Sequence, residues 1–337
     1  MRNNGATEMS DARRIVSFLP SATEMVFALG LGEQLVGRSH ECDWPPEARR
    51  KPVVVRPAIP LEGLSSPEID IVVSERIRSG ASLYQVDETL LREIAPNLIL
   101  TQDLCQVCAP SGNEVAQVLR SLREPPQILW LTPRSVAGIF QNVGELAAAT
   151  GREAAAANLI AEGRSRLDRV TEMARQFPRT RVFCMEWLDP IYCGGHWLPE
   201  MVEMAGGEDA LGRTGSDSVR IAWADVLAWA PEVIIVSPCG YHLERTMRLA
   251  QSLPALRQWN ELPAVQSGRV FAVDADSYFA RPGPRVVDGV ELLAHLIHPD
   301  GFPWMGPPQS YAQVKTKTCE SCNLPFLCGT EDASSAH

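Results

Sequence analysis

The chain has 337 residues, of which 45% are hydrophobic and 21% charged, the composition of a folded protein rather than an extensively disordered one. Its net charge of −10, without clustered Lys and Arg, argues against a nucleic-acid binder and against attraction to an anionic membrane surface. The length is sufficient for two domains of ordinary size.

The first residues show no targeting segment. Residues 1–14 are polar and lack the apolar core of an export signal. No run of roughly 18 uncharged apolar residues follows, so we expect no membrane insertion. We therefore expect a cytoplasmic location, or a periplasmic one if a signal was removed. Nine cysteines then favour reduced thiols or metal ligands over disulfides.

The first half of the chain alternates short apolar runs with helix-prone segments. A helix is expected over 24–29, because Ser and Thr residues precede it and Gly30 follows it. Continuous apolar runs of this kind are typical of a parallel sheet covered on both faces. The expected strands are 15–18, 53–55, 71–73, 98–100 and 128–130.

Two helices are expected in the middle of the chain, over 135–150 and 152–176. The second is rich in alanine and, at 1.5 Å per residue, would be on the order of 35 Å long. A helix of that length could bridge two lobes, and an ordinary covering helix is the alternative. The first should end at Gly151.

The second half repeats the pattern of the first, with strands expected over 182–185, 233–236 and 270–273, and helices over 200–205, 243–251 and 285–297. The sequence therefore predicts an α/β fold of two Rossmann-like lobes, each a mostly parallel sheet with helices, joined by a single long helix. The expected boundaries are 13–134 for the first lobe, 135–178 for the helical connector, 179–300 for the second lobe and 301–337 for a cysteine-containing tail.

Two groups of cysteines have spacings that are compatible with metal binding, and the first group also fits a redox pair. Cys105 and Cys108 follow a predicted strand as a CxxC pair, which fits zinc, a redox pair or a structural role. Cys319, Cys322 and Cys328 form a second group, for which free thiols in a disordered tail are the alternative to a metal site. Zinc or iron at a cysteine cluster is thus left open, and no cofactor is required. Glycine loops for nucleotides and the HExxH motif are absent from the sequence, which disfavours an enzyme.

Several motifs resemble the cobalamin and iron-complex binding proteins of ABC importers. The resemblance covers about residues 13–300 and rests on the order and spacing of its motifs. The segment 71–87 is longer than the resemblance leads us to expect. The matching motifs are Pro20-Ser21-Ala22-Thr23-Glu24, Ala28-Leu29-Gly30-Leu31-Gly32, Cys42-Asp43-Trp44-Pro45-Pro46-Glu47-Ala48, Leu91-Arg92-Glu93-Ile94-Ala95-Pro96-Asn97-Leu98-Ile99-Leu100 and Ala230-Pro231-Glu232-Val233-Ile234-Ile235.

The resemblance implies a bilobal solute-binding fold that holds cobalamin or a related corrinoid in the cleft between its lobes. The protein would act without making or breaking a bond, as the substrate-binding component of uptake or as a cytosolic carrier. An ABC transporter permease is the implied partner, with Glu88 and Asp225 as candidate docking residues. Two alternatives remain at this stage: a cytosolic enzyme acting on a corrinoid, haem or chelated metal through Cys105 and Cys108, and a siderophore or haem binder.

A corrinoid is broad and partly apolar, so its site needs aromatic walls and a few polar anchors, which the loops after the strands supply. Tyr192 and Arg281 lie where the family places an aromatic ring and a polar arginine. For the aromatic residues the alternative is core packing, and for Arg281 it is a surface salt bridge. The candidate ligand-binding residues are Glu41, Trp44, Tyr84, Gln102, Asp103, Trp187, Tyr192, His196, Trp197, Tyr241, Tyr278 and Arg281.

Overall fold

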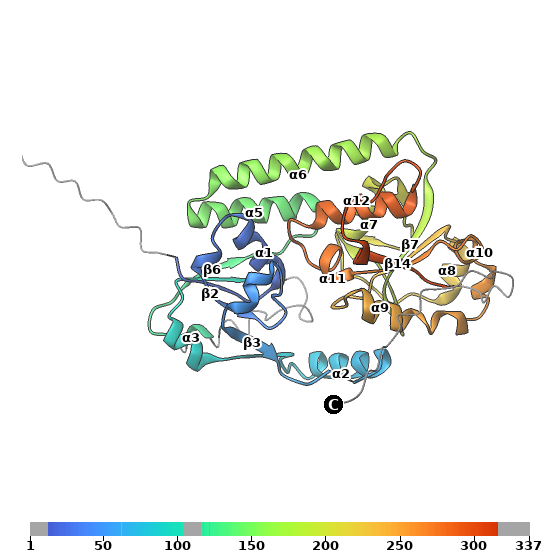
Figure 1. Cartoon of the computed structure of the whole chain (residues 1–337). Coiled ribbons are helices and arrows are strands. Elements are labelled where there is room, and N and C mark those ends of the chain that lie inside the picture. The colour runs from blue at the N-terminus through green and yellow to red at the C-terminus, as the bar shows by residue number, and fades with distance from the viewer. Residues whose placement is uncertain (1–12, 62, 104–115, 117, 121, 316–337) are drawn as a thin grey trace, which may run out of the picture.

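The computed structural model describes residues 13–61, 63–103, 116, 118–120 and 122–315, which form two α/β lobes (Figure 1). Each lobe is built on a sheet of six described strands. The prediction of two mostly parallel sheets with helices is therefore confirmed. None of the described helices is long and apolar enough to cross a membrane.

The first sheet has the strand order β4-β3-β2-β1-β5-β6, and its neighbours are parallel except for β3 and β4. Buried aliphatic residues fill β1 and β5, as expected for central strands of a covered sheet. Its strands are β1 (Ile15–Ser17), β2 (Leu35–Ser39), β3 (Val53–Pro57), β4 (Tyr84–Val86), β5 (Leu98–Thr101) and β6 (Gln127–Trp130). Its helices are α1 (Pro20–Ala28), α2 (Ser66–Arg78), α3 (Glu88–Ile94) and the 3₁₀ turns Gly32–Gln34 and Pro46–Arg50.

The second sheet has the order β10-β7-β12-β13-β14, with β8 paired to β7. Strands β9 (Gly195–His196) and β11 (Arg213–Thr214) form a separate ribbon. The sheet strands are β7 (Thr180–Leu188), β8 (Ile191–Cys193), β10 (Gly207–Glu208), β12 (Val233–Val236), β13 (Val270–Val273) and β14 (Tyr311–Gln313). The helices are α7 (Leu198–Met204), α8 (Trp223–Trp229), α9 (Leu243–Ala250), α10 (Pro263–Gln266), α11 (Ala275–Tyr278), α12 (Val286–Ile297) and the 3₁₀ turns Leu253–Ala255, Trp259–Glu261 and Pro308–Ser310.

Helices α5 (Val136–Thr150) and α6 (Glu153–Ala174) join the lobes. The Ser135 side chain caps α5 by accepting from the Gly138 amide at 3.0 Å, and Gly151 ends it in the left-handed region at φ 67°. Helix α6 has 22 residues and runs along both lobes (Figure 1). The predicted long connecting helix is therefore confirmed.

One hydrophobic core extends across both lobes. It contains Ile15 and Met25 of the first lobe, Leu167 of α6, and Val182 and Val290 of the second lobe. Two smaller clusters fill the opposite faces of the two sheets. Because side chains of both lobes share one packed core, the lobes are held firmly along the side that α6 covers.

Both lobes repeat the same helix-to-strand connection. Helix α3 ends at Ala95 with φ 49° and ψ 63°, and α8 ends at Ala230 with φ 48° and ψ 62°. A proline follows each alanine, and strands β5 and β12 begin two residues later. The left-handed alanine ends each helix and directs the chain back into the sheet.

Two predicted segments differ from the structure. Residues 71–73, expected as a strand, lie in α2, because Pro67 and the Ser65/Glu68 capping box start a helix ahead of this short apolar run. The expected boundary at residue 300 is too early, because β14 pairs antiparallel with β13. The chain to residue 315 thus belongs to the second lobe.

Candidate ligand-binding site between the lobes

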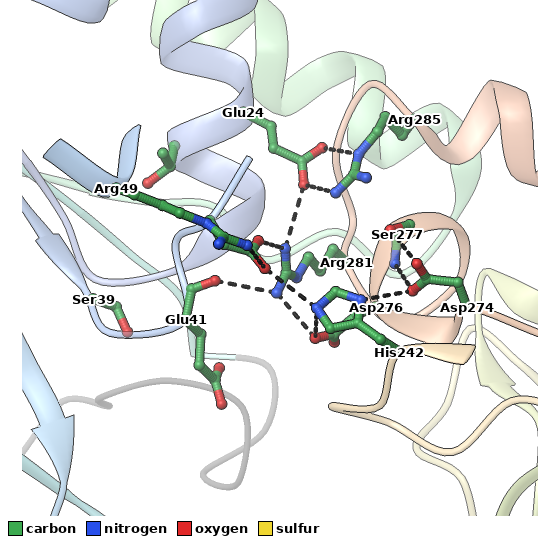
Figure 2. A network of polar contacts seen from close by, with 12 residues as sticks. Glu24, Ser39, Glu41, Arg49, His242, Asp274, Asp276, Ser277, Arg281 and Arg285 are labelled. Carbon is green, nitrogen blue, oxygen red and sulfur yellow. Dashed lines mark hydrogen bonds and ion pairs between the residues drawn. The ribbon is translucent and has the colours of Figure 1, made fainter. Parts of the chain in front are cut away.

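A polar network joins the two lobes, with Arg281 at its centre (Figure 2). Arg281 follows α11 and is 8% exposed. Its Nη1 donates to Asp43 Oδ1 of the first lobe at 2.5 Å, and its Nη2 donates to Asp276 Oδ2 at 3.0 Å. The Nη2 also donates to the Glu41 carbonyl oxygen at 3.1 Å. Arg281 therefore bridges the lobes, and both of its terminal nitrogens already donate to a carboxylate or a carbonyl.

A buried ion pair lies behind Arg281. Arg285, which precedes α12, donates from Nε and Nη2 to the two carboxylate oxygens of Glu24 at 3.0 and 2.6 Å. Glu24 lies on α1, where burial raises the pKa of its carboxyl group and Arg285 opposes that effect. The Arg285 guanidinium also lies 5.0 Å from the Trp44 ring centroid. This pair fixes α1 to the start of α12.

His242 extends the network at the start of α9. Its Nδ1 lies 3.0 Å from Asp274 Oδ1, and its Nε2 lies 3.3 Å from Asp43 Oδ2. Hydrogen bonds to Asp274 and Asp43 raise the pKa of His242 to about 10. Burial alone would raise the pKa of Asp43, but the hydrogen bond to His242 and the charge of Arg281 hold it well below its usual range. We therefore treat His242 as a cation at neutral pH.

The charges of the network compensate one another. Arg49 lies 3.6 Å from Asp43. Within the described part of the chain, the network thus contains four cations and four carboxylates. The Glu41 carboxyl lies beside this balanced set, where partial desolvation, with the nearby Asp276, raises its pKa to about 7. The four cations are Arg49, His242, Arg281 and Arg285, and the four carboxylates are Glu24, Asp43, Asp274 and Asp276.

Aromatic side chains lie near the network in each lobe. The Trp187 and Tyr241 ring centroids are 5.5 Å apart, and the Arg245 guanidinium covers the Tyr241 ring at 3.8 Å. In the first lobe, the rings of His40 and Tyr84 lie 6.5 Å apart. Trp187 lies in β7 and Tyr84 begins β4, whereas Tyr241 lies in the loop after β12 and is buried, at 5% exposed. A contact of these rings with a ligand stays a prediction.

The structure places the remaining candidates in different surroundings. Tyr192 contacts the first lobe through its hydroxyl, at 3.3 Å from Asp70. His196 Nε2 pairs with Asp217 at 3.0 Å within the second lobe. Gln102 is buried after β5, and the Asp103 amide, beside it, donates to the Thr132 hydroxyl at 3.1 Å.

Trp197 and Tyr278 are core residues, which differs from the sequence prediction. Trp197 is 5% exposed, and its indole N–H donates to the Phe279 carbonyl at 2.8 Å. Tyr278 packs edge-on against Trp304, and its hydroxyl lies 2.9 Å from that of Ser310. Both polar atoms thus have partners inside the second lobe, so these side chains support the site from behind.

Sequence reasoning missed the charged members of the network, among them Glu24, Asp43 and His242. Two signals could have identified them. Asp43 lies between the candidates Glu41 and Trp44, and His242 directly follows the candidate Tyr241. Glu24 is the only charged residue of α1, and a charge in a buried helix needs a partner.

The described residues contain no group of three or more His, Cys, Asp or Glu side chains that could hold a metal ion. The pairs Cys105/Cys108 and Cys319/Cys322, with Cys328, lie outside the described residues. Four described cysteines are free thiols. One of them, Cys42, is buried next to the network, and burial raises the pKa of its thiol to about 11.

Comparisons with known proteins agree with the two-lobe architecture. The sequence pattern of the family described as periplasmic binding protein matches residues 15–277. An uncharacterized ABC transporter substrate-binding lipoprotein of Bacillus subtilis is 26% identical over 89% of this chain and 84% of its own length. A vitamin B12-binding protein of Vibrio cholerae is 26% identical over 85% of this chain and 89% of its own length.

Solved structures show the same fold at lower identity. The periplasmic vitamin B12 binding protein of Vibrio cholerae has a TM-score of 0.59 at 24% identity, covering 85% of this chain and 96% of its own. A periplasmic haem binding protein from Pseudomonas aeruginosa has a TM-score of 0.66 at 18% identity, covering 91% and 99%. These similarities establish the fold and leave the ligand open.

The relatives also bear on location and activity. Their names describe a lipoprotein and periplasmic proteins, which does not support the cytoplasmic location expected from residues 1–14. The family binds solutes and is not enzymatic, so the alternative of an enzyme using Cys105 and Cys108 is not supported. The chain belongs to the periplasmic binding protein family, as a small-molecule-binding substrate-binding protein of the ABC importer type.

Proposed function

We propose that this protein binds cobalamin or a related corrinoid between its lobes and delivers it, outside the cytoplasm, to an ABC transporter permease. The relatives named as vitamin B12-binding proteins support the ligand class. The observation that carries the proposal is the charge compensation of the network around Arg281. Glu88, at the start of α3, and Asp225, at the start of α8, remain our candidates for docking to the permease.

Charge compensation favours a ligand with neutral hydrogen-bonding groups at its edge. A corrinoid carries amides there, whereas haem carries two propionates and many siderophore complexes are anionic. An anionic ligand gains most from a cation that lacks a counter-charge. Here Asp43 and Asp276 already neutralise Arg281, and Asp43 and Asp274 neutralise His242. An incoming carboxylate would have to displace these partners.

The same contacts disfavour iron coordination by His242 and Tyr192. An axial ligand to iron needs a ring nitrogen or a phenol oxygen that is not already paired. Both ring nitrogens of His242 face carboxylates, at 3.0 and 3.3 Å. The Tyr192 hydroxyl contacts Arg220 and Asp70. We therefore expect the protein to recognise the ligand through contacts with its edge and its faces, and not through an axial bond to its metal.

The test is to change the charge balance at one position. In Asp43→Asn, Arg281 and His242 lose a shared counter-charge. We expect the ratio of hemin affinity to cyanocobalamin affinity to rise about tenfold, since one charge-assisted contact is worth on the order of 1.5 kcal/mol. Fluorescence titrations with both ligands measure this ratio.

Two further variants serve as controls. Asp43→Glu keeps the charge, and Glu47→Gln removes an exposed carboxylate four residues away, in the 3₁₀ turn that follows. Both should retain the parent ratio. A ratio that does not change in Asp43→Asn, or parent protein that binds hemin more tightly than cyanocobalamin, would show that charge compensation does not select the ligand.

A further inference from the structure

Helix α2 stands apart from the cores of both lobes. It lies in the segment between β3 and β4, which pair antiparallel at the edge of the first sheet. None of its residues belongs to a hydrophobic core cluster of the described part of the chain. Its Ile71 and Ile77 are exposed, at 54% and 39%. Ile69 and Ser66 are the buried residues of α2. A helix is usually held in place by burying an apolar face, so with this small buried face α2 also depends on other contacts.

Polar contacts with residues of the second lobe hold α2 in place. Asp70 Oδ2 accepts from Arg220 Nη2 at 2.6 Å, and Asp70 Oδ1 accepts from the Tyr192 hydroxyl at 3.3 Å. Arg220 Nε in turn donates to the Tyr192 oxygen at 2.9 Å. We call Asp70, Tyr192 and Arg220 the latch. Figure 1 shows α2 running beneath the second lobe, on the side opposite α6.

The latch and the ends of α2 are suited to opening. The Arg220 side chain is half-exposed, and an ion pair in contact with water stabilises by only about 0.2–1 kcal/mol. Gly63 and Gly80 flank the helix, both at positive φ and with open space around them. Such positions tolerate the backbone changes of a hinge. By contrast, the core shared by the lobes holds the α6 side closed.

We propose that α2 is a lid that closes across the two lobes, and that the latch controls how fast a ligand enters and leaves. The identity of the ligand rests on the proposed function, whereas the closure of α2 does not. A large ligand held between the lobes must pass the side opposite α6, which α2 crosses. The latch also fixes Tyr192, a candidate ligand contact, so closing would set the position of that ring.

Hydrogen exchange tests the latch without any ligand. In Asp70→Ala and in Arg220→Ala, amides of residues 66–78 should exchange about threefold to tenfold faster than in the parent, because the lid opens more often. Glu75→Ala is the matched control, since it removes an exposed carboxylate from the same helix and should leave the exchange unchanged. The exchanged pair Asp70→Arg with Arg220→Asp should restore protection.

Stopped-flow kinetics with cyanocobalamin test the lid. If α2 controls passage, Asp70→Ala should raise both the association and the dissociation rate constants, and the exchanged pair should lower both again. If the latch were only a structural contact, its loss would raise the dissociation rate constant alone. The lid proposal is overturned if amide exchange over 66–78 is unchanged in Asp70→Ala and Arg220→Ala, or if only the dissociation rate constant rises. Failure of the parent to bind cyanocobalamin overturns the proposed ligand instead, and the exchange result then decides on the latch.

Discussion

Asp43 and His242 show how the site depends on single residues that are distant in sequence. They are 199 residues apart and meet only because the lobes face each other. Sequence analysis identified aromatic candidates and Arg281, because loops after strands and a matching motif point to them. It did not identify the charged partners, because a pairing between lobes leaves no local pattern. The core positions of Trp197 and Tyr278 depend on contacts within the second lobe, with Phe279 and Ser310, which leave no pattern that separates them from the other aromatic candidates.

The charge of His242 makes the contact between the lobes depend on pH. Its pKa in the folded protein is about 10, above the ordinary value of 6.5. The stabilisation is therefore fully present below pH 6.5 and is lost as pH rises through about 10. The groups that face its ring are Asp43, Asp274 and Asp276.

We expect the melting temperature of the parent to exceed that of His242→Gln near pH 7, and the difference to shrink between pH 8 and 10.5. Thermal melts of both proteins across this range measure the difference, and comparison with the variant cancels the titration of other groups. A difference that stays constant with pH would mean that His242 acts through its shape and not its charge.

At the scale of elements, the sequence predicts long or well-capped units and misses short, context-dependent ones. Helices 136–150 and 153–174 were predicted to within two residues, because Ser135 and Gly151 mark their ends. The run 71–73 fits a strand and a helix equally well over three residues, and only the preceding capping box decides it. Strand β14 was missed because a three-residue edge strand has little pattern of its own.

Helix α12 positions the network, and a glycine allows it to do so. A Cβ at Gly289 would meet the backbone carbonyl of Tyr278 in α11, and Met201 Cε at 2.7 Å. Gly289→Ala should therefore force α11 away from α12 and destabilise the protein by about 1–3 kcal/mol.

Gly144→Ala provides the comparison. It lies inside α5 with no atom within 4 Å of a new Cβ, and it should stabilise by about 1 kcal/mol through helix propensity. Urea denaturation measures both variants. Equal effects of the two substitutions would refute the close approach of α11 to α12.

The whole molecule combines a fixed side with a side that is closed by polar contacts. Along α6 the lobes share one hydrophobic core, and Arg166 of α6 pairs with Asp288 and Glu291 of α12 at 2.5 and 2.6 Å. On the other sides the lobes meet through Arg281, His242 and the latch. The latch, whose Arg220 side chain is half-exposed, opens at less cost than a packed core, so we expect ligand exchange to occur on its side.

The central claim is that the space between the lobes accepts a corrinoid in preference to an anionic macrocycle. A titration of the purified parent protein with cyanocobalamin, dicyanocobinamide and hemin tests it most directly. The account predicts saturable binding of both corrinoids at one site per chain, and weaker binding of hemin. Tighter binding of hemin, or no binding of either corrinoid, would contradict it.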